Sequence, residues 1–181
     1  RGALMGPVVA AAVILPHNLR VSWRNEVRDS KQLRPPVRED LFQKIKDAAV
    51  AVGIGIMSNE VIDNLGIATA TRLAMVAAIE QLVPGPQYLL IDYLKLPEVS
   101  LPQRGIVFGD SLCFSIACAS IIAKVTRDRL VVAMAREYPG YGLAGHKGYG
   151  TPEHLDCLRR NGPSPVHRRS FHPVCDMIKV P

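Results

Sequence analysis

Hydrophobic residues recur along this chain in two periods, and each period predicts one kind of element. The run from Val8 to Leu15 is continuously apolar and rich in β-branched residues, which predicts a buried strand. Pro35 opens a predicted helix, because the apolar residues after it recur with a period near 3.6. Val50 to Met57 predicts a second strand, in which Gly53 and Gly55 imply a close backbone neighbour.

The alternation of helices and strands continues through the middle of the chain. Ser58 is expected to cap a short helix that ends near Leu65, and a longer helix should follow over about 67–82. Four large apolar residues, Tyr88 to Ile91, predict a short strand that is buried on both faces, and 105–108 predicts another. This order favours an α/β fold with a mostly shared sheet.

Two further helices are predicted toward the carboxyl end. Asp110 can cap a long helix over about 112–138. Thr151 and Pro152 mark the start of a final helix, with Thr as the N-cap and Pro in the first turn, and Gly162 follows its end.

Composition is consistent with one folded domain and sets limits on its location. The chain has 181 residues, of which 48% are hydrophobic, so it can bury a full core. No apolar stretch in the sequence is expected to span a bilayer, and Pro7 to Pro16 is too short and lacks the flanks of a signal peptide. We therefore expect a soluble cytoplasmic protein.

Positive charge is concentrated in the last third of the chain. The net charge is +6, with 12 Lys/Arg against 11 Asp/Glu in residues 1–123 and 10 against 5 in residues 124–181. A basic segment of this kind suggests an anionic partner such as nucleic acid. A basic surface that serves only solubility would show the same imbalance.

The four cysteines show no C-x-x-C pair. Cys113 and Cys118 lie within a helical pattern and are expected to be small buried hydrophobic residues. The other two flank a pair of histidines, so a zinc cluster is conceivable, although the spacing matches no common site. Its four members would be Cys157, His167, His172 and Cys175.

Carboxylates supply the first candidate chemistry. Asp92 ends the strand predicted over 88–91, at the position where open α/β sheets bind their ligands, although a helix N-cap or a solvated turn would also explain it. Ser120, Lys124 and Asp128 follow at i, i+4 spacing on the long helix, where a plain surface ion pair is the alternative. If Asp92 and Asp128 lie together, a divalent cation would relieve their repulsion.

Two loops could bind phosphate. Residues 140–145 fit G-x-G-x-x-G, but they follow a helix and open none, so we reject a dinucleotide site. The same loop continues into His146, Lys147 and Tyr149, which suit phosphate and base stacking, although a loop with tyrosines packed on the core explains them too. Ser30 and Lys31 could likewise hold phosphate or belong to a capped turn.

Several blocks of sequence together carry a family resemblance. They are Arg1-Gly2, Gly6–Ala10, Asp29–Leu33, Ile91-Asp92, Gly109–Ser111, Ser115–Ala117, Ala119–Arg129, Tyr138–Gly142, His146–Thr151 and Gly162–Phe171. In this order and at these lengths, they resemble prokaryotic type 2 ribonuclease H, ribonuclease HII. The resemblance spans essentially the whole chain.

This resemblance implies a fold and an activity. The fold would be ribonuclease H-like, with a mixed central sheet flanked by helices over 1–140 and a C-terminal loop-helix extension of the same domain over 141–181. The activity would be that of an endonuclease that cuts the RNA strand of RNA–DNA hybrids and nicks 5′ of single ribonucleotides in duplex DNA. Four acidic residues of the family bind two Mg²⁺ or Mn²⁺ ions, and Asp92 and Asp128 match the third and fourth.

The resemblance also implies how the substrate is bound. We expect the protein to be a monomer. Arg1 and Gly2 resemble the end of a Gly-Arg-Gly turn whose backbone reads the ribose 2′-hydroxyl. Tyr149 resembles the tyrosine that stacks on the ribose at the RNA–DNA junction. The residues that would contact phosphates are Ser30, Lys31, His146, Lys147, Arg168 and Arg169.

The sequence departs from the family pattern at two places. The family's first two acids form an Asp-Glu pair just before the Gly-Arg-Gly turn, and this sequence begins at Arg1 without them. We therefore expect little cleavage by the 181-residue chain, with a catalytically inactive nucleic-acid-binding domain as the alternative. Phe108 and Leu112 also stand where many members have Lys, which removes an expected phosphate contact.

Overall fold

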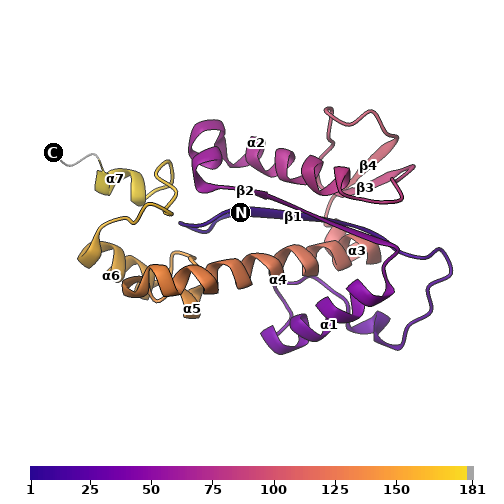
Figure 1. The fold of residues 1–181 in the computed structure, drawn as a ribbon, viewed down its shortest axis with the longest axis horizontal. Coiled ribbons are helices and arrows are strands. Elements are labelled where there is room, and N and C mark those ends of the chain that lie inside the picture. The colour runs from indigo at the N-terminus through magenta and orange to yellow at the C-terminus, as the bar shows by residue number, and fades with distance from the viewer. Residues whose placement is uncertain (179–181) are drawn as a thin grey trace. The chain divides into compact units, whose positions relative to one another are not determined.

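The computed structural model describes residues 1–178 and has a mixed α/β architecture (Figure 1). In chain order, its elements are β1 (Val8–Ile14), η1 (Ser22–Glu26), α1 (Pro35–Ala48), β2 (Ala51–Met57), α2 (Asn59–Glu80), β3 (Leu89–Asp92), β4 (Gln103–Ile106), α3 (Gly109–Leu112), α4 (Phe114–Glu137), η2 (Pro139–Tyr141), α5 (Leu143–His146), α6 (Pro152–Asn161) and α7 (Val174–Ile178). The strands and long helices expected from the hydrophobic pattern are confirmed, with boundaries shifted by a few residues.

The chain forms two compact units whose members do not follow sequence order. The terminal unit contains Arg1–Val8, Ile56–Thr71 and the described residues from Thr126 onward. The strand unit contains Val9–Gly55 and Arg72–Val125. Residues 141–178 therefore share a unit with the first eight residues of the chain.

Two pairs of strands form the β-structure of the strand unit. β1 is hydrogen-bonded to β2, and β3 pairs in parallel with β4 so that Asp92 stands opposite Ile106. One shared sheet was expected, but the hydrogen-bond ladders within residues 1–178 form two separate two-stranded sheets. Within this unit, the β1–β2 pair lies between α2 on one side and α1 with α4 on the other (Figure 1).

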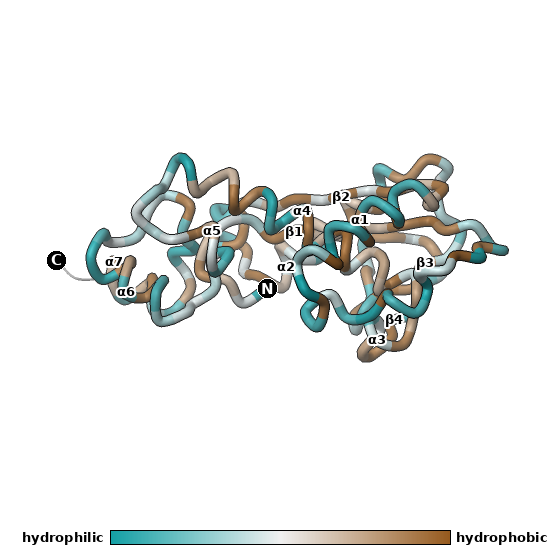
Figure 2. Tube along the Cα trace, turned by 90° about the horizontal axis from the view of Figure 1, so that it is seen from below, coloured by the Kyte–Doolittle hydropathy of each residue, from teal (hydrophilic) through white to brown (hydrophobic). Residues whose placement is uncertain are grey.

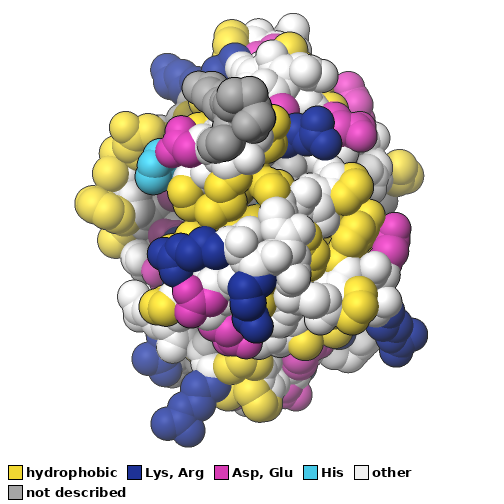
Figure 3. All heavy atoms as spheres, turned by 90° about the vertical axis from the view of Figure 1, so that its left-hand side faces the viewer, with side chains coloured by type: hydrophobic (Ala, Val, Ile, Leu, Met, Phe, Trp, Pro, Cys, Tyr) yellow, Lys and Arg dark blue, Asp and Glu magenta, His cyan; other side chains and the backbone are white. Residues whose placement is uncertain are grey.

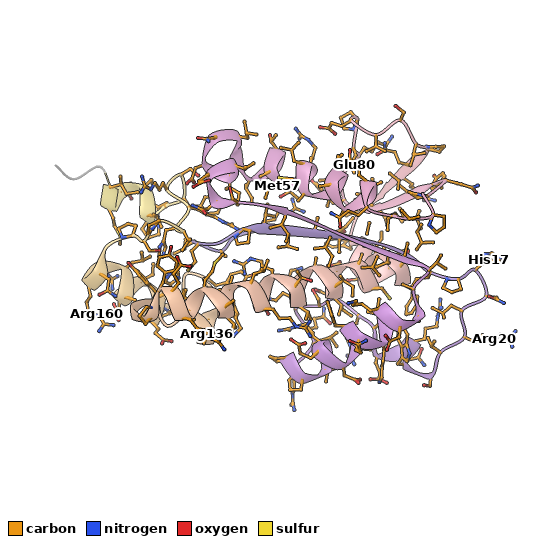
Figure 4. The ribbon with its side chains drawn as sticks, viewed as in Figure 1. His17, Arg20, Met57, Glu80, Arg136 and Arg160 are labelled. Carbon is orange, nitrogen blue, oxygen red and sulfur yellow. The ribbon has the colours of Figure 1, made fainter. Side chains whose placement is uncertain are left out.

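A helix pair provides the largest buried cluster of the strand unit. Leu41, Phe42 and Ile45 lie on one face of α1, at the spacing of successive helical turns. They pack with Cys118 and Ile121 of α4, and the partly buried residues of β1 and β2 cover the cluster. The hydrophobic stretches of these strands are brown in Figure 2, and side chains fill the space beside them in Figure 4. Burial of this apolar surface is the main force that holds the unit together.

Polar loops surround this core. The segment between β1 and η1 carries His17 and Arg20, which are exposed and point away from the ribbon in Figure 4. The loop thus follows the usual rule that connections with polar backbone groups run over the surface.

The two glycines of β2 confirm the close approach that the sequence predicted. A Cβ at Gly53 would lie 1.9 Å from the carbonyl oxygen of Ala78, and one at Gly55 would lie 1.9 Å from that of Ala74. Both oxygens belong to α2, so β2 and the helix backbone touch where neither has a bulky side chain.

The expectation that β3 is buried on both faces is wrong. Leu89 and Ile91 are each 7% exposed and pack with Met75 and Ile79 of α2, whereas Leu90 is 45% exposed. Because side chains alternate across a strand, a continuous apolar run does not reveal that only one face is covered.

Helix α2 is bent where two predicted helices meet. Gly66 has φ 78° and ψ 155°, outside the helical region, and Ser58 Oγ accepts a hydrogen bond from Val61 N–H at 3.3 Å. By length and composition alone, α2 could cross a membrane, contrary to the sequence expectation. Gly66 interrupts this helix, and Ala70, Ala74 and Ala78 in its second part are fully buried.

Asp110 does not cap the long helix as expected. It lies within the short helix α3, and Cys113 leaves the helical conformation with φ −124° and ψ 118° before α4 begins at Phe114. Asp110 instead forms an ion pair with Lys31, with 3.6 Å between Oδ2 and Nζ.

The terminal unit has its own core beneath α6. Leu4, Met5, Val131 and Leu158 are buried in one cluster. The predicted start of α6 is confirmed, because the Thr151 side chain accepts a hydrogen bond from the backbone N–H of His154. Beyond residue 162, the chain forms an antiparallel bridge between His167 and Met5 and then the short α7, which the sequence did not predict.

We expect Gly55→Ala to destabilise the protein by roughly 3 kcal/mol, because the added methyl group would overlap a backbone carbonyl that cannot rotate away. Urea unfolding monitored by circular dichroism measures this change. Gly85→Ala is the matched control: a Cβ there meets nothing within 4 Å, so its free energy of unfolding should stay within about 0.5 kcal/mol of the wild type. Equal effects of the two substitutions would contradict the close approach of β2 to α2.

Candidate functional site

Asp92 lies at the carboxyl end of β3, where the sequence placed it. It is half-buried, and its Oδ1 accepts a hydrogen bond of 2.9 Å from the backbone N–H of Gly109. A Cβ at residue 109 would lie 3.3 Å from the same oxygen and 2.8 Å from Ile116 Cδ1, so this close approach is easiest for glycine. The next residue, Tyr93, has φ 69° and turns the chain away from the strand. The carboxylate is therefore fixed by backbone contacts.

An exposed lysine lies in the same unit and pairs with two acidic residues. Lys31 Nζ is 3.5 Å from Asp29 Oδ1 and 3.6 Å from Asp110 Oδ2, and its side chain is 76% exposed. Such exposed pairs contribute little to stability, so this ammonium group remains able to meet an anion from solvent.

Ser30 lies beneath this lysine in the interior. It is 3% exposed, and its Oγ is 2.9 Å from Ser120 Oγ on α4. Its carbonyl oxygen accepts a hydrogen bond of 3.0 Å from Nη1 of Arg38, a buried residue that sequence reasoning missed. Ser30 and Ser120 therefore hold the 29–33 loop to α4.

Asp128 belongs to the terminal unit, whereas Asp92 belongs to the strand unit. Asp128 lies on α4 and is buried, with 9% of the residue exposed. The proximity of the two carboxylates stays a prediction.

The glycine-rich segment after α4 forms η2 and α5 and has no strand before it, in keeping with the rejection of a dinucleotide site. His146 supports this loop with both ring nitrogens: Nδ1 accepts a hydrogen bond from Gly148 N–H at 3.1 Å, and Nε2 lies 2.8 Å from the carbonyl oxygen of Tyr141. Tyr149 is 36% exposed, and the Arg127 guanidinium carbon lies 5.4 Å from its ring centroid. The tyrosine ring is thus partly covered on the protein side and open to solvent on the other.

Two fully buried histidines lie behind this loop, and the sequence did not point to one of them. His154 Nε2 is 3.1 Å from His167 Nε2, His154 Nδ1 is 2.9 Å from the Tyr149 carbonyl oxygen, and His167 Nδ1 accepts from Ser164 N–H at 2.9 Å. A carbonyl only accepts, so His154 Nδ1 carries the proton and His167 Nε2–H donates to the bare His154 Nε2. All four nitrogens are satisfied only when both rings are neutral. Burial lowers the pKa of both, that of His167 to about 4.

Asp63 of α2 orders the segment that contains Arg169. Its two carboxylate oxygens accept hydrogen bonds of 2.9 Å from the backbone N–H groups of Arg169 and Ser170, and one of 2.6 Å from Ser170 Oγ. The Arg169 side chain itself is exposed. Sequence reasoning missed Asp63 because nothing in its local pattern marks a partner more than 100 residues away.

Arg168, predicted to contact phosphate, is instead 1% exposed. Its guanidinium donates to the carbonyl oxygens of Arg1, Gly6 and Pro7. Arg127 is also buried, so part of the basic charge of the last third does not reach the surface. On the face that bears α6 and α7, Figure 3 shows basic side chains interspersed with acidic and hydrophobic ones.

The cysteines and histidines near the carboxyl end do not form a zinc centre. Within residues 1–178, no group of three or more His, Cys, Asp or Glu side chains could hold a metal ion. Cys157 lies in the apolar core of the terminal unit, and His172 pairs with Asp176 at 2.8 Å. Cys118 is fully buried, which raises the pKa of its thiol to about 12 and keeps it protonated.

The donor chemistry of Asp92 and Asp128 fits a hard divalent cation. Carboxylate oxygens suit Mg²⁺ and Mn²⁺, and Mg²⁺ is often bound through one or two carboxylates together with substrate phosphates. Within residues 1–178, Gly109 occupies only Oδ1 of Asp92, which leaves Oδ2 to act as a ligand. The oxygen ligands that these two residues offer are therefore of the type that Mg²⁺ and Mn²⁺ prefer.

The chain has an α/β fold, a carboxylate at a strand end, another on a long helix, and exposed Lys31 and Arg169, which together favour an anionic ligand. Residues 1–174 match the family model of ribonuclease HII. The ribonuclease HII of Dehalococcoides mccartyi strain BAV1 is 58% identical over 178 residues, which cover 98% of this chain and 84% of the relative. The chain belongs to the ribonuclease HII family, a family of nucleases.

Solved structures share the fold. The ribonuclease H2 of Pyrococcus horikoshii OT3 superposes with a TM-score of 0.80 at 26% identity, covering 98% of this chain and 92% of that one. The Bst ribonuclease HIII in complex with Mn²⁺ gives 0.65 at 16% identity, covering 98% and 66%, a likeness of fold alone. The expected ribonuclease H-like fold is confirmed.

We expect the buried histidine pair to make the protein sensitive to acid. Between pH 6.5 and about 4, His167 takes up a proton in the unfolded chain but not in the folded one. The free energy of unfolding should therefore fall as pH is lowered through this window, by roughly 3 kcal/mol from this residue. Urea unfolding at pH 7, 6, 5 and 4 measures the effect.

The contribution of His167 is isolated by two variants. His167→Gln should reduce the loss of stability between pH 6.5 and 4, whatever its stability at pH 7. His17→Gln, at an exposed histidine of the loop after β1, should keep the pH dependence of the wild type. An unchanged slope in His167→Gln would show that the neutral pair does not cause the acid sensitivity.

Proposed function

We propose that this protein is an endoribonuclease that hydrolyses the RNA strand of RNA–DNA hybrids and nicks 5′ of single ribonucleotides in duplex DNA. The observation that carries the proposal is the family match over residues 1–174. A cytoplasmic location and a monomeric state stay predictions.

Asp92 and Asp128 are the proposed metal-holding carboxylates. Two bound Mg²⁺ or Mn²⁺ ions would activate a water molecule and stabilise the charge of the leaving oxygen. The water would attack the scissile phosphorus and the bond to the 3′-oxygen would break, which leaves 5′-phosphate and 3′-hydroxyl ends. The protein holds Asp92 in place through the Gly109 N–H group, so the carboxylate needs no reordering when a cation arrives.

The proposed substrate contacts differ in how directly the side chains can act. Lys31 and Arg169 are exposed and suit phosphate oxygens, and Lys147 is half-buried in the loop that presents Tyr149. Tyr149 would stack on the ribose at the junction, and the backbone of the exposed residues Arg1 and Gly2 would meet the 2′-hydroxyl.

Three further residues would act behind this surface. Ser30 and Arg168 are buried, and His146 uses both ring nitrogens within its own loop. We propose that they support the contacting segments and do not bind phosphate themselves.

The alternative function is binding of a hybrid duplex without cleavage. The exposed side chains of Lys31 and Arg169 are consistent with such binding. Such binding should weaken steeply as salt rises, because phosphate contacts release counterions.

We expect a polypeptide of residues 1–181 to bind a duplex that contains one ribonucleotide and to cleave it little or not at all in Mn²⁺. The same polypeptide preceded by Asp-Glu-Ala-Gly at the end of a family-like strand should cleave it, because two more carboxylates would then compensate the metal charge. A gel assay of the nicked strand measures both. Robust nicking by residues 1–181 would overturn the requirement for the added pair.

In the extended polypeptide, Asp92→Asn should lower the cleavage rate by roughly 100-fold or more, since it removes an anionic ligand at the metal. Asp47→Asn, at an exposed residue of α1 that accepts a hydrogen bond from Gln43, is the matched control and should cleave at the wild-type rate. Full activity of Asp92→Asn would contradict the proposed site.

A further inference from the structure

The first seven residues form a segment without regular structure that is nonetheless largely buried. Ala3, Leu4 and Met5 are 1%, 6% and 0% exposed, whereas Arg1 and Gly2 are exposed. Two backbone hydrogen bonds of 2.8 Å hold the segment, from Leu4 N–H to the Gly148 oxygen and from Gly6 N–H to the Val166 oxygen. The exposed pair therefore extends from a well-anchored base.

Two buried arginines complete this anchor. Arg168 donates from Nε to the Gly6 oxygen at 3.0 Å, from Nη2 to the Pro7 oxygen at 3.1 Å, and from Nη1 to the Arg1 oxygen. Arg127 donates to the oxygens of Met5 at 3.0 Å, Pro7 at 3.3 Å and Lys147 at 3.1 Å. Four of the seven carbonyl groups in this segment thus accept from a guanidinium.

The electrostatic setting of these arginines is unusual. They are 8% and 1% exposed, and among the described residues neither guanidinium has a carboxylate oxygen within 4.0 Å. Burial and the neighbouring Arg127 lower the pKa of Arg168 to about 10, so Arg168 remains charged at neutral pH. Burial also lowers the pKa of Arg127. Burying two like charges is costly, and the hydrogen-bonded carbonyl groups are the contacts that offset that cost most directly. The rings of Tyr149 and Phe171 and the more distant carboxylates of Asp128 and Asp63 also favour the charged guanidinium groups.

This arrangement requires arginine at both positions. A guanidinium presents its donors in a rigid planar fork and can reach three differently placed oxygens at once. A lysine would keep the charge, but a single nitrogen at the end of a flexible stem cannot reproduce the three contacts.

We propose that Arg127 and Arg168 are positioning residues that hold the backbone of residues 1–7 and thereby orient Arg1 and Gly2 toward the ribose of a ribonucleotide in a duplex. Of these two arginines, Arg168 is the one whose guanidinium donates a hydrogen bond to the Arg1 carbonyl oxygen. The identity of the ligand rests on the proposed function, whereas the positioning role does not. The role also explains why a buried arginine lies in the basic segment that was predicted to contact phosphate.

Hydrogen exchange tests the positioning role without any reference to activity. In Arg168→Lys, the amides of Leu4 and Gly6 should exchange at least tenfold faster than in the wild type. The amide of Ala49, which donates to Ile45 at the end of α1, should be unchanged and reports that the strand unit remains folded. Arg136→Lys is the matched control, because this exposed arginine (labelled in Figure 4) also belongs to the terminal unit. Unchanged exchange of Leu4 and Gly6 in Arg168→Lys would overturn the proposal.

Arg127→Lys provides the second variant, because it removes a different set of contacts to the same segment. It should accelerate exchange at Leu4 and Gly6 in the same way. If Arg168→Lys fails to fold, Arg127→Lys tests the proposal instead. Faster exchange of the Leu4 and Gly6 amides would support the positioning role, and unchanged exchange would overturn it.

Binding by residues 1–181 tests the consequence for recognition and needs no cleavage. We compare affinities for a duplex with one ribonucleotide and for the same duplex made only of DNA. Arg168→Lys should lower the ribose preference of the wild type at least fivefold and change affinity for the DNA duplex less than threefold. A ribose preference that persists although exchange is accelerated would overturn the orienting role. A wild type without ribose preference would refute the proposed ligand of Arg1 and Gly2. The hydrogen-exchange result would still show whether the two arginines hold residues 1–7 in place.

Discussion

Two buried guanidinium groups impose the strongest constraint on the terminal unit. A buried charge must be compensated, and the hydrogen bonds that compensate these two come from the carbonyl groups of residues 1–7 and of Lys147. Those carbonyls can point at Arg127 and Arg168 only if the N-terminal segment lies between α4 and the 164–168 turn. The Met5–His167 bridge is consistent with this placement. The arginines therefore decide where three distant segments meet.

The histidine pair adds a second constraint on the same loops. His154 belongs to α6, His167 to the turn that pairs with Met5, and His154 Nδ1 reaches the carbonyl oxygen of Tyr149. Because every nitrogen of the pair has one role in the neutral form, the hydrogen bonds specify a single arrangement of α6, the turn and the tyrosine loop. In the strand unit, the contact of β2 with α2 plays a comparable part: two glycines remove the side chains that would separate strand and helix.

Local patterns in the sequence predicted much of the fold and part of the candidate site. Thr151 as an N-cap, Gly53 and Gly55 as sites of close approach, and Asp92 at a strand end all follow from neighbours within a few residues, and the structure bears out each placement. The prediction was wrong for Asp110 and for the covered faces of β3. Asp110 lies in a separate short helix, because the chain leaves the helical conformation at Cys113 before α4 begins, and only one face of β3 has a helix packed on it.

The sequence by itself determined the family, the positions of most helices and strands, and the residue types that suit a metal and an anionic duplex. These properties reside in short-range periodicity and in ordered blocks of residues. Only the tertiary structure decided which polar residues reach solvent. Arg168 and Arg169 are adjacent, yet one is buried beneath residues 1–7 and the other is exposed. The physical reason is that burial and hydrogen-bond partners come from segments up to 167 residues away, which no local pattern records.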